Sequence, residues 1–195
     1  GSSGAGGGGG ASNGGYGGRG RDRLGNTTVY GSTTQPVALG SGGGDYNNTN
    51  TAGEGGGAIK LTVAGTTTIN GVISANGTIG TSQANGGGGG SGGSIWLISN
   101  SFNGSGSVTA NGGDSRDESA DAGGGGGGRI ALNYTSNSLT QSQLSAMGGR
   151  PLGGDAASQK GGAGTVYLKA VSATNGDLII DNKVTSWNTS QSKVA

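Results

Sequence analysis

The chain has 195 residues, of which 51 are glycine, 29% hydrophobic and 4% aromatic; glycine has no strict three-residue period and there are only two prolines, which excludes a collagen triple helix. The formal net charge of +1, from 11 basic and 10 acidic residues, argues against nucleic acid or an anionic membrane as a partner. Cysteine and histidine are absent, which excludes disulfides, thiolate chemistry and histidine-based acid–base catalysis, and no apolar run is long enough for membrane insertion.

The N-terminal segment, residues 1–57, is rich in glycine and fits the pattern of the later segments poorly. Its apolar residues Val29, Val37 and Leu39 predict a degenerate first coil or a cap, because terminal repeats are commonly atypical. The stretch YGGRGRDR at residues 16–23 resembles arginine–glycine nucleic-acid segments, but one copy in a nearly neutral chain is weak support. The chain as given has no initiator methionine and no signal peptide, so we expect a processed product or a fragment.

Four later segments share one pattern, and each follows a glycine run. Their starts are 36, 35 and 36 residues apart, and such a near-constant period indicates an internal repeat. The segments read AIKLTVAGTTTINGVISANG from Ala58, SIWLISNSFNGSGSVTANGG from Ser94, RIALNYTSNSLTQSQLSAMGG from Arg129 and TVYLKAVSATNGDLIIDN from Thr165.

Each segment opens with alternating apolar residues, which predicts a strand with one buried face. These are Ile59 and Leu61, Ile95 and Leu97, Ile130 and Leu132, and Val166 and Leu168. A second short strand is predicted after a polar stretch, at Ile73 and Ala75, Val108 and Ala110, Leu144 and Ala146, and Leu178 and Ile180. Left-handed turns are then predicted at Asn76-Gly77 and Asn111-Gly112, whereas Met147-Gly148 would interrupt an asparagine stack.

A unit of this size cannot bury its apolar face alone, but stacked copies can, with each strand paired in parallel with its equivalent. We therefore expect an all-β fold, a parallel β-solenoid with coils of about 35 residues. The predicted boundaries are an N-terminal segment or cap at 1–57, a repeat region at 58–182 and a polar tail or cap at 183–195, where Val184 and Trp187 could cover the last coil. Within the repeat region the four units are 58–93, 94–128, 129–164 and 165–182.

Glycine runs recur at equivalent positions in the units, at residues 86–90, 123–128 and 161–164. We expect them to stack as extended or polyproline-II-like segments whose N–H and C=O groups pair between neighbours, joined by residues 6–10 and 55–57. The alternative is that the runs are surface loops selected for flexibility.

The run GGGGGSGGSIWLISNSFNGSGSVTANGG, with GGAGTVYLKA and GDLIIDN further on, resembles the glycine-rich repeats of large bacterial surface or secreted proteins. This resemblance covers roughly residues 28 to 182. It implies an extracellular, non-catalytic, solenoid-like module, and it carries no defined active site to transfer. The glycine-rich receptor-binding tips of phage fibres are a more distant likeness, based on glycine runs alone.

Acidic residues cluster once, in GGDSRDESADAGGGG, which supplies Asp114, Asp117, Glu118 and Asp121. The simplest interpretation is a solvated loop, because Arg116 lies inside the cluster and glycine surrounds it. Calcium is the alternative ligand, since carboxylates are hard oxygen ligands, although the nonapeptide of calcium-binding β-rolls is absent. We expect no other cofactor.

The outward positions of the first strands are Lys60, Trp96, Ala131 and Tyr167. Trp96 and Tyr167, with Lys60, are candidates for a sugar-stacking platform or a protein contact. The alternative is that Trp96 packs under the N-terminal segment.

These features predict an extracellular or cell-surface structural protein that is not an enzyme. We expect self-association head-to-tail through the solenoid ends, which would propagate as a filament. The second candidate is an adhesin or carbohydrate-binding module that recognises a surface glycan. An enzyme comes third, because no convergent acid–base pair is evident.

Overall fold

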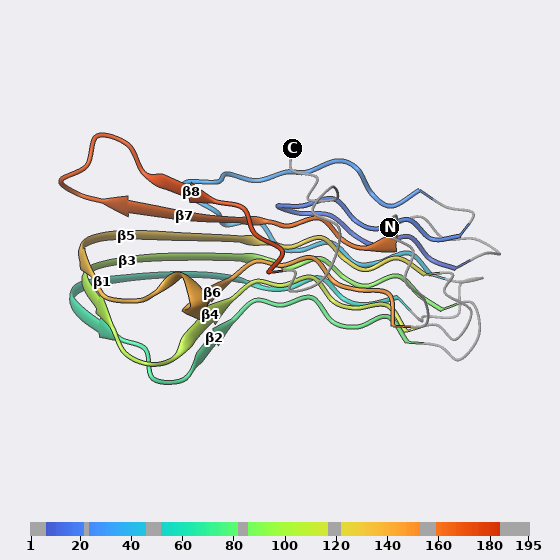
Figure 1. Ribbon diagram of the computed structural model, residues 1–195, viewed down its shortest axis with the longest axis horizontal. Helices are drawn as coiled ribbons and strands as arrows, with labels where there is room; N and C mark the ends of the chain where they lie inside the picture. The colour runs from blue at the N-terminus through green and yellow to red at the C-terminus, as the bar shows by residue number, and fades with distance from the viewer. Residues whose placement is uncertain are drawn as a thin grey trace.

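The computed structural model describes residues 7–21, 24–45, 52–81, 86–116, 122–152 and 159–183. The fold is mostly β, and these residues contain no α-helix, only the short 3-10 helix η1 at Gln141–Gln143. Figure 1 shows two halves: the strands lie at one end, and long extended segments without strands lie at the other. We call them the strand half and the glycine half.

A five-stranded mixed sheet contains the first strand of every repeat, in the order β1-β3-β5-β7-β8. The first four strands pair in parallel, as predicted, and β8 pairs with β7 in antiparallel orientation. Their bounds are β1 Ala58–Thr68, β3 Ser94–Asn103, β5 Arg129–Asn137, β7 Thr165–Ala170 and β8 Asp177–Ile179.

The register of this sheet confirms both predicted apolar ladders. One row joins Ile59, Ile95, Ile130 and Val166, and the other joins Leu61, Leu97, Leu132 and Leu168. The middle members of each row are fully buried, whereas Leu61, on the edge strand β1, is 40% exposed. The difference arises because β3 and β5 have a neighbouring strand on each side, whereas β1 has one on one side only.

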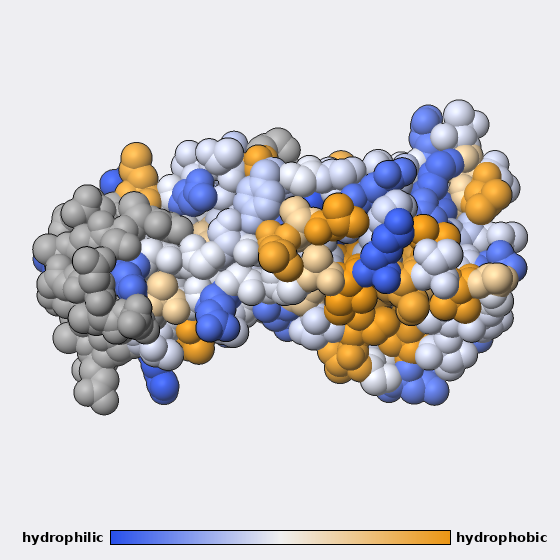
Figure 2. Space-filling view, turned by 180° about the vertical axis from the view of Figure 1, so that it is seen from behind, coloured by the Kyte–Doolittle hydropathy of each residue, from blue (hydrophilic) through white to orange (hydrophobic). Residues whose placement is uncertain are grey.

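A three-stranded parallel sheet contains the second strands, β2 Val72–Ser74, β4 Ser107–Thr109 and β6 Leu144–Ser145. Its register aligns Ile73, Val108 and Leu144, as predicted. The hydrophobic core is one cluster that includes Phe102, Val108 and, from the apolar ladders of the five-stranded sheet, every member except Leu61. Figure 2 shows hydrophobic side chains concentrated over the strand half.

The second strand predicted for the fourth unit is present as β8, but its predicted place beside the other second strands is wrong. Leu178 lies in β8 opposite Tyr167, not beside Leu144, and is 52% exposed. Leu178 follows Leu168 by 10 residues, one or two fewer than in the earlier units, and Asn175-Gly176 precedes β8. The chain turns at Ala170–Ala173, where the N–H of Ala173 donates to the carbonyl oxygen of Ala170 at 3.1 Å, and then runs back along β7.

The predicted left-handed turns at Asn76-Gly77 and Asn111-Gly112 are also wrong, because neither pair contains a residue with positive φ. The asparagine side chains instead connect successive units. Asn76 Oδ1 accepts the N–H of Asn111 at 2.7 Å, and Asn111 Oδ1 accepts the N–H of Met147 at 2.8 Å. Met147 has no side-chain oxygen with which to continue this pattern. The N–H of the next residue, Gly148, donates instead to Asn182 Oδ1.

Glycine runs 86–90, 123–128 and 161–164 are buried and hydrogen-bonded to neighbouring segments, so the interpretation as surface loops is wrong for these runs. Segment 123–128 has a three-residue pattern of donors. Gly123 and Gly126 donate to segment 7–14, Gly124 and Gly127 donate to 159–164, and Gly125 and Gly128 donate to 110–116. The carbonyl groups of the same segment accept from further neighbours, 86–93, 15–20 and 146–152 among them.

The glycine half therefore has three layers. The four segments that lead into the parallel strands β1, β3, β5 and β7 form the middle layer. The return segments that follow β2, β4 and β6 lie on one side of it, and N-terminal segments 7–14, 15–20 and 38–44 lie on the other. Much of the N-terminal region thus belongs to the glycine half, while Val37 and Leu39 are 59% and 65% exposed. The proposed cap residues Val184 and Trp187 lie outside the described residues.

Candidate functional site

The predicted outward row lies on the five-stranded sheet in the expected register, with Lys60, Trp96, Ala131 and Tyr167 side by side on successive strands. Trp96 is partly buried. Its Nε1–H donates to Asn133 Oδ1 at 2.8 Å, and Lys60 Nζ lies 4.1 Å from the centroid of its ring. The Lys60 ammonium therefore covers one face of the indole as a cation–π contact.

Tyr167 is separated from Trp96 by Ala131, which is fully buried. The hairpin between β7 and β8 packs on the tyrosine so closely that a Cβ atom placed on Gly176 would overlap its ring. The two aromatic residues thus share a row, but the structure does not bring their rings together as one open platform.

An N-terminal segment crosses the same outer face, at the beginning of the strands. Ser94 Oγ donates to the carbonyl oxygen of Ala38 at 2.6 Å. Arg129 Nε donates to the carbonyl oxygen of Tyr30 at 3.0 Å, and its Nη1 donates to Thr33 Oγ1 at 2.9 Å and to Thr165 Oγ1 at 3.3 Å. These bonds tie residues 30–38 to β3 and β5, and Arg129 also links β5 to β7.

Arg129 is 6% exposed, and burial lowers the pKa of its guanidinium below its ordinary value. The chain bends over this side chain at Gly31, whose φ of +83° is a conformation that favours glycine. The sequence prediction did not single out Arg129. The sequence does contain one indication of its role: Arg129 is a charged residue at the position where the neighbouring units have Ser94 and Thr165.

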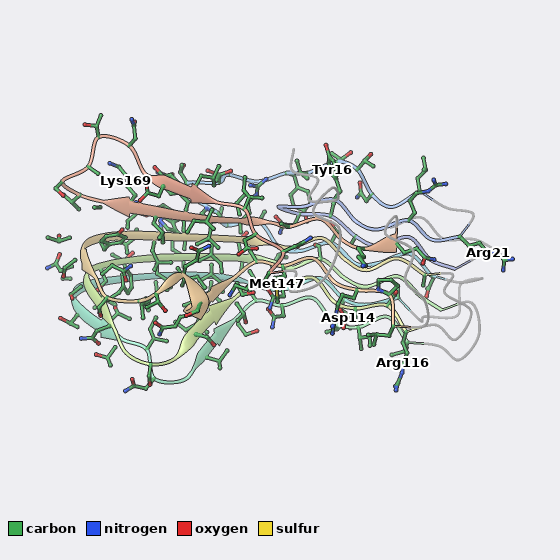
Figure 3. All side chains as sticks on the ribbon, in the orientation of Figure 1. Tyr16, Arg21, Asp114, Arg116, Met147 and Lys169 are labelled. Atoms are coloured by element: carbon green, nitrogen blue, oxygen red, sulfur yellow. The ribbon has the colours of Figure 1, made fainter. Side chains whose placement is uncertain are left out.

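Of the four candidate calcium ligands, the structure describes Asp114, whereas Asp117, Glu118 and Asp121 lie outside the described residues. Asp114 Oδ1 accepts the backbone N–H of Arg150 at 2.7 Å, and Oδ2 lies 3.4 Å from Arg150 Nη2. Figure 3 places Asp114 and Arg116 in the glycine half, away from the strands. The described part of the chain contains no group of three or more potential metal-binding side chains.

A shallow hollow, too small for more than about one water molecule, lies beside β6, β7 and β8. Its lining includes Leu144, Val166 and Ile179, with Asp181 and Lys183 as its charged members. The Asp181 carboxylate accepts the backbone N–H of Lys183 at 2.6 Å, so it stabilises a local turn. Lys183 Nζ donates to the carbonyl oxygen of Ser142 at 3.2 Å.

No family model matches the chain, and neither the curated proteins nor the solved structures contain a significant match. No helix within the described ranges is long and apolar enough to cross a membrane.

Proposed function

We propose that the chain is an extracellular structural protein built as a β-solenoid, in which each coil combines two strands with a glycine segment of polyproline-II type. A polyproline-II helix has three residues per turn and no internal hydrogen bonds, so all its backbone donors point outward. The three-residue donor pattern of segment 123–128 matches this geometry and is the observation that carries the proposal.

The solenoid interpretation is supported by the sequence separation between neighbouring segments, which is similar in the strand half and the glycine half. Strand partners are 35 or 36 residues apart in the five-stranded sheet, as in Ile59, Ile95, Ile130 and Val166. The glycine segments keep a similar spacing, since Gly89 donates to Gly123 and Gly92 to Gly126. Each repeat therefore adds one strand to the five-stranded sheet in the strand half and one neighbouring segment in the glycine half.

A structural rather than catalytic role is supported by how the interior is occupied. The buried space is filled by the apolar core cluster and by backbone groups of glycine that bond to one another. The hollow beside β8 has one acidic and one basic side chain, each hydrogen-bonded to the backbone. A convergent acid–base pair, which hydrolytic chemistry requires, is thus not evident in that lining.

The alternative, an adhesin or glycan-binding module, has less support. Lys60 lies over the Trp96 ring, and Gly176 packs against Tyr167. A sugar would have to displace Lys60 before it could stack on the face of the indole that Lys60 covers. The extracellular location rests on the resemblance to glycine-rich repeats of bacterial surface proteins.

Self-association is part of the proposal, because the end of a strand stack carries unpaired backbone groups. We expect the purified chain to form assemblies whose size increases with protein concentration. Sedimentation velocity and negative-stain electron microscopy over a concentration series would measure this, with calcium or chelator added in parallel. A monodisperse monomer at every concentration would contradict a self-assembling structural role, and dependence on calcium would implicate the acidic segment.

A further inference from the structure

The two ends of the strand stack differ. At one end the hairpin strand β8 covers β7, and its residue Ile179 packs against the core cluster. At the other end, β1 and β2 are edge strands. Leu61 and Val72 at this end are 40% and 68% exposed, and a Cβ atom on Gly57, Gly65 or Gly71 would meet nothing within 4 Å. We call this surface the β1 end; Figure 2 shows hydrophobic side chains gathered over the strand half that contains it.

The backbone groups on the open side of β1 follow from its pairing with β3. The carbonyl oxygen of Gly57 accepts the N–H of Ser94, so Gly57 faces β3. Backbone groups of successive strand residues alternate in direction, and the parallel register is unbroken from Ala58 to Val63. Lys60 and Thr62 therefore present their N–H and C=O groups to the open side.

The strand that best matches the open edge of β1 is β1 of a second copy of this chain. Among the described strands, β3, β5 and β7 are paired on both sides, and β8 has three residues against eleven in β1. Only another β1 offers an unpaired edge of matching length. Lys60 is the one charged residue of β1, β2 has none, and β1 contains no proline, so this edge has few of the features that block edge pairing.

Charge also argues against one register. In an antiparallel pair centred on Lys60, two like charges would lie directly opposite each other, which is unfavourable. An antiparallel pair centred on Leu61 places Lys60 opposite Thr62 and Ile59 opposite Val63, and it keeps the apolar side chains of both copies on one face.

We infer that the β1 end binds the β1 end of a second copy, as a symmetric pair whose two-fold axis passes beside Leu61. The inference rests on the proposed self-association and names its partner and geometry. It replaces head-to-tail contact at this end by head-to-head contact, which closes a dimer and does not propagate a filament through β1.

The contact is small. Eleven strand residues extend for about 35 Å and facing sheets lie about 10 Å apart, which gives an end surface well below the ~800 Å² per partner of a standard interface. The dimer therefore depends on the edge hydrogen bonds as well as on the apolar contact, and it dissociates on dilution.

A single cysteine tests the geometry, because the chain has no cysteine of its own. In the proposed dimer, Leu61→Cys places the thiols of the two copies opposite each other. Residue 61 would form a non-hydrogen-bonded pair with its copy, with the two Cα atoms about 4.5 Å apart, a distance that a disulfide can span. Mild oxidation is expected to yield a covalent dimer. The matched control is Val171→Cys, which is 74% exposed beside the hairpin, and it is expected to remain monomeric.

A second variant tests the edge itself. Thr62→Pro removes a backbone donor on the open side of β1 without removing a bond to β3, a position where edge strands tolerate proline. It is expected to weaken dimerisation about tenfold by sedimentation, since two edge hydrogen bonds are lost per dimer. Thr62→Ala is expected to dimerise as the parent does.

The outcomes separate this inference from the proposed function. Equal cross-linking of Val171→Cys and Leu61→Cys, or self-association that Thr62→Pro leaves unchanged, would overturn head-to-head pairing and leave a self-assembling structural role intact. A parent chain that stays monomeric throughout the concentration series would overturn both.

Discussion

Gly125→Ala is expected to prevent folding or to lower the free energy of unfolding by more than about 4 kcal/mol. A Cβ atom at this position would overlap the carbonyl oxygen of Gly90 and lie 2.5 Å from the carbonyl carbon. Both atoms belong to the backbone of a neighbouring glycine segment, so no side chain can rotate away. The segment itself is held on several sides by hydrogen bonds and has little room to shift.

The matched control is Gly65→Ala, in the interior of β1. A Cβ atom there meets nothing within 4 Å, and Gly65 is not among the glycines with positive φ. Alanine in a strand interior is more favourable than glycine by roughly 0.5–1 kcal/mol. Denaturant unfolding of both variants should therefore show opposite changes in midpoint. Equal tolerance of both substitutions would mean that the glycine segments are not packed against each other.

Arg129→Ala is expected to lower the free energy of unfolding by about 2–3 kcal/mol, because it deletes three hydrogen bonds and leaves the carbonyl group of Tyr30 without this partner. The substitution also removes the desolvation cost of the buried guanidinium, and this gain limits the loss of unfolding free energy. The bonds join the N-terminal segment to the sheet, so proteases should cut residues 24–38 faster in the variant.

Arg150→Ala is the control for this second substitution. The Arg150 side chain is 72% exposed, and its Nη2 lies 3.4 Å from Asp114 Oδ2. Exposed pairs contribute little, so the expected change is within about 0.5 kcal/mol. If Arg129→Ala and Arg150→Ala had equal stability and equal resistance to proteolysis, Arg129 would not anchor the N-terminal segment.

The parallel strands could be predicted because two independent periods agreed: apolar residues alternate with period two, and the units recur every 35 or 36 residues. Together they fixed which residues are neighbours in the sheet, such as Ile95 and Ile130. The prediction failed at the last unit, where the stretch between the two apolar strands is one or two residues shorter and the chain turns at Ala170–Ala173 into a hairpin.

Other features could not be read from local pattern. Asparagine before glycine favours a left-handed turn in isolation, but in a stack Asn76 gains a bond to the next unit's backbone, and the chain stays extended. The anchor at Arg129 depends on Tyr30 and Thr33, almost a hundred residues earlier in the chain. The outward row of Lys60, Trp96 and Tyr167 was predicted in register, but the contacts that cover its rings come from the side-chain conformation of Lys60 and from the hairpin.

Hydrogen exchange of the glycine amide protons tests the central claim most directly, that the glycine runs form a packed bundle continuous with the strands. NMR would resolve the amides of segments 86–93 and 123–128 beside those of β3 and β5. The bundle predicts protection of the glycine amides comparable to that of the strands, because both open only when the coils separate. Exchange of the glycine amides at the rate of an unstructured chain, with the strands still protected, would contradict it.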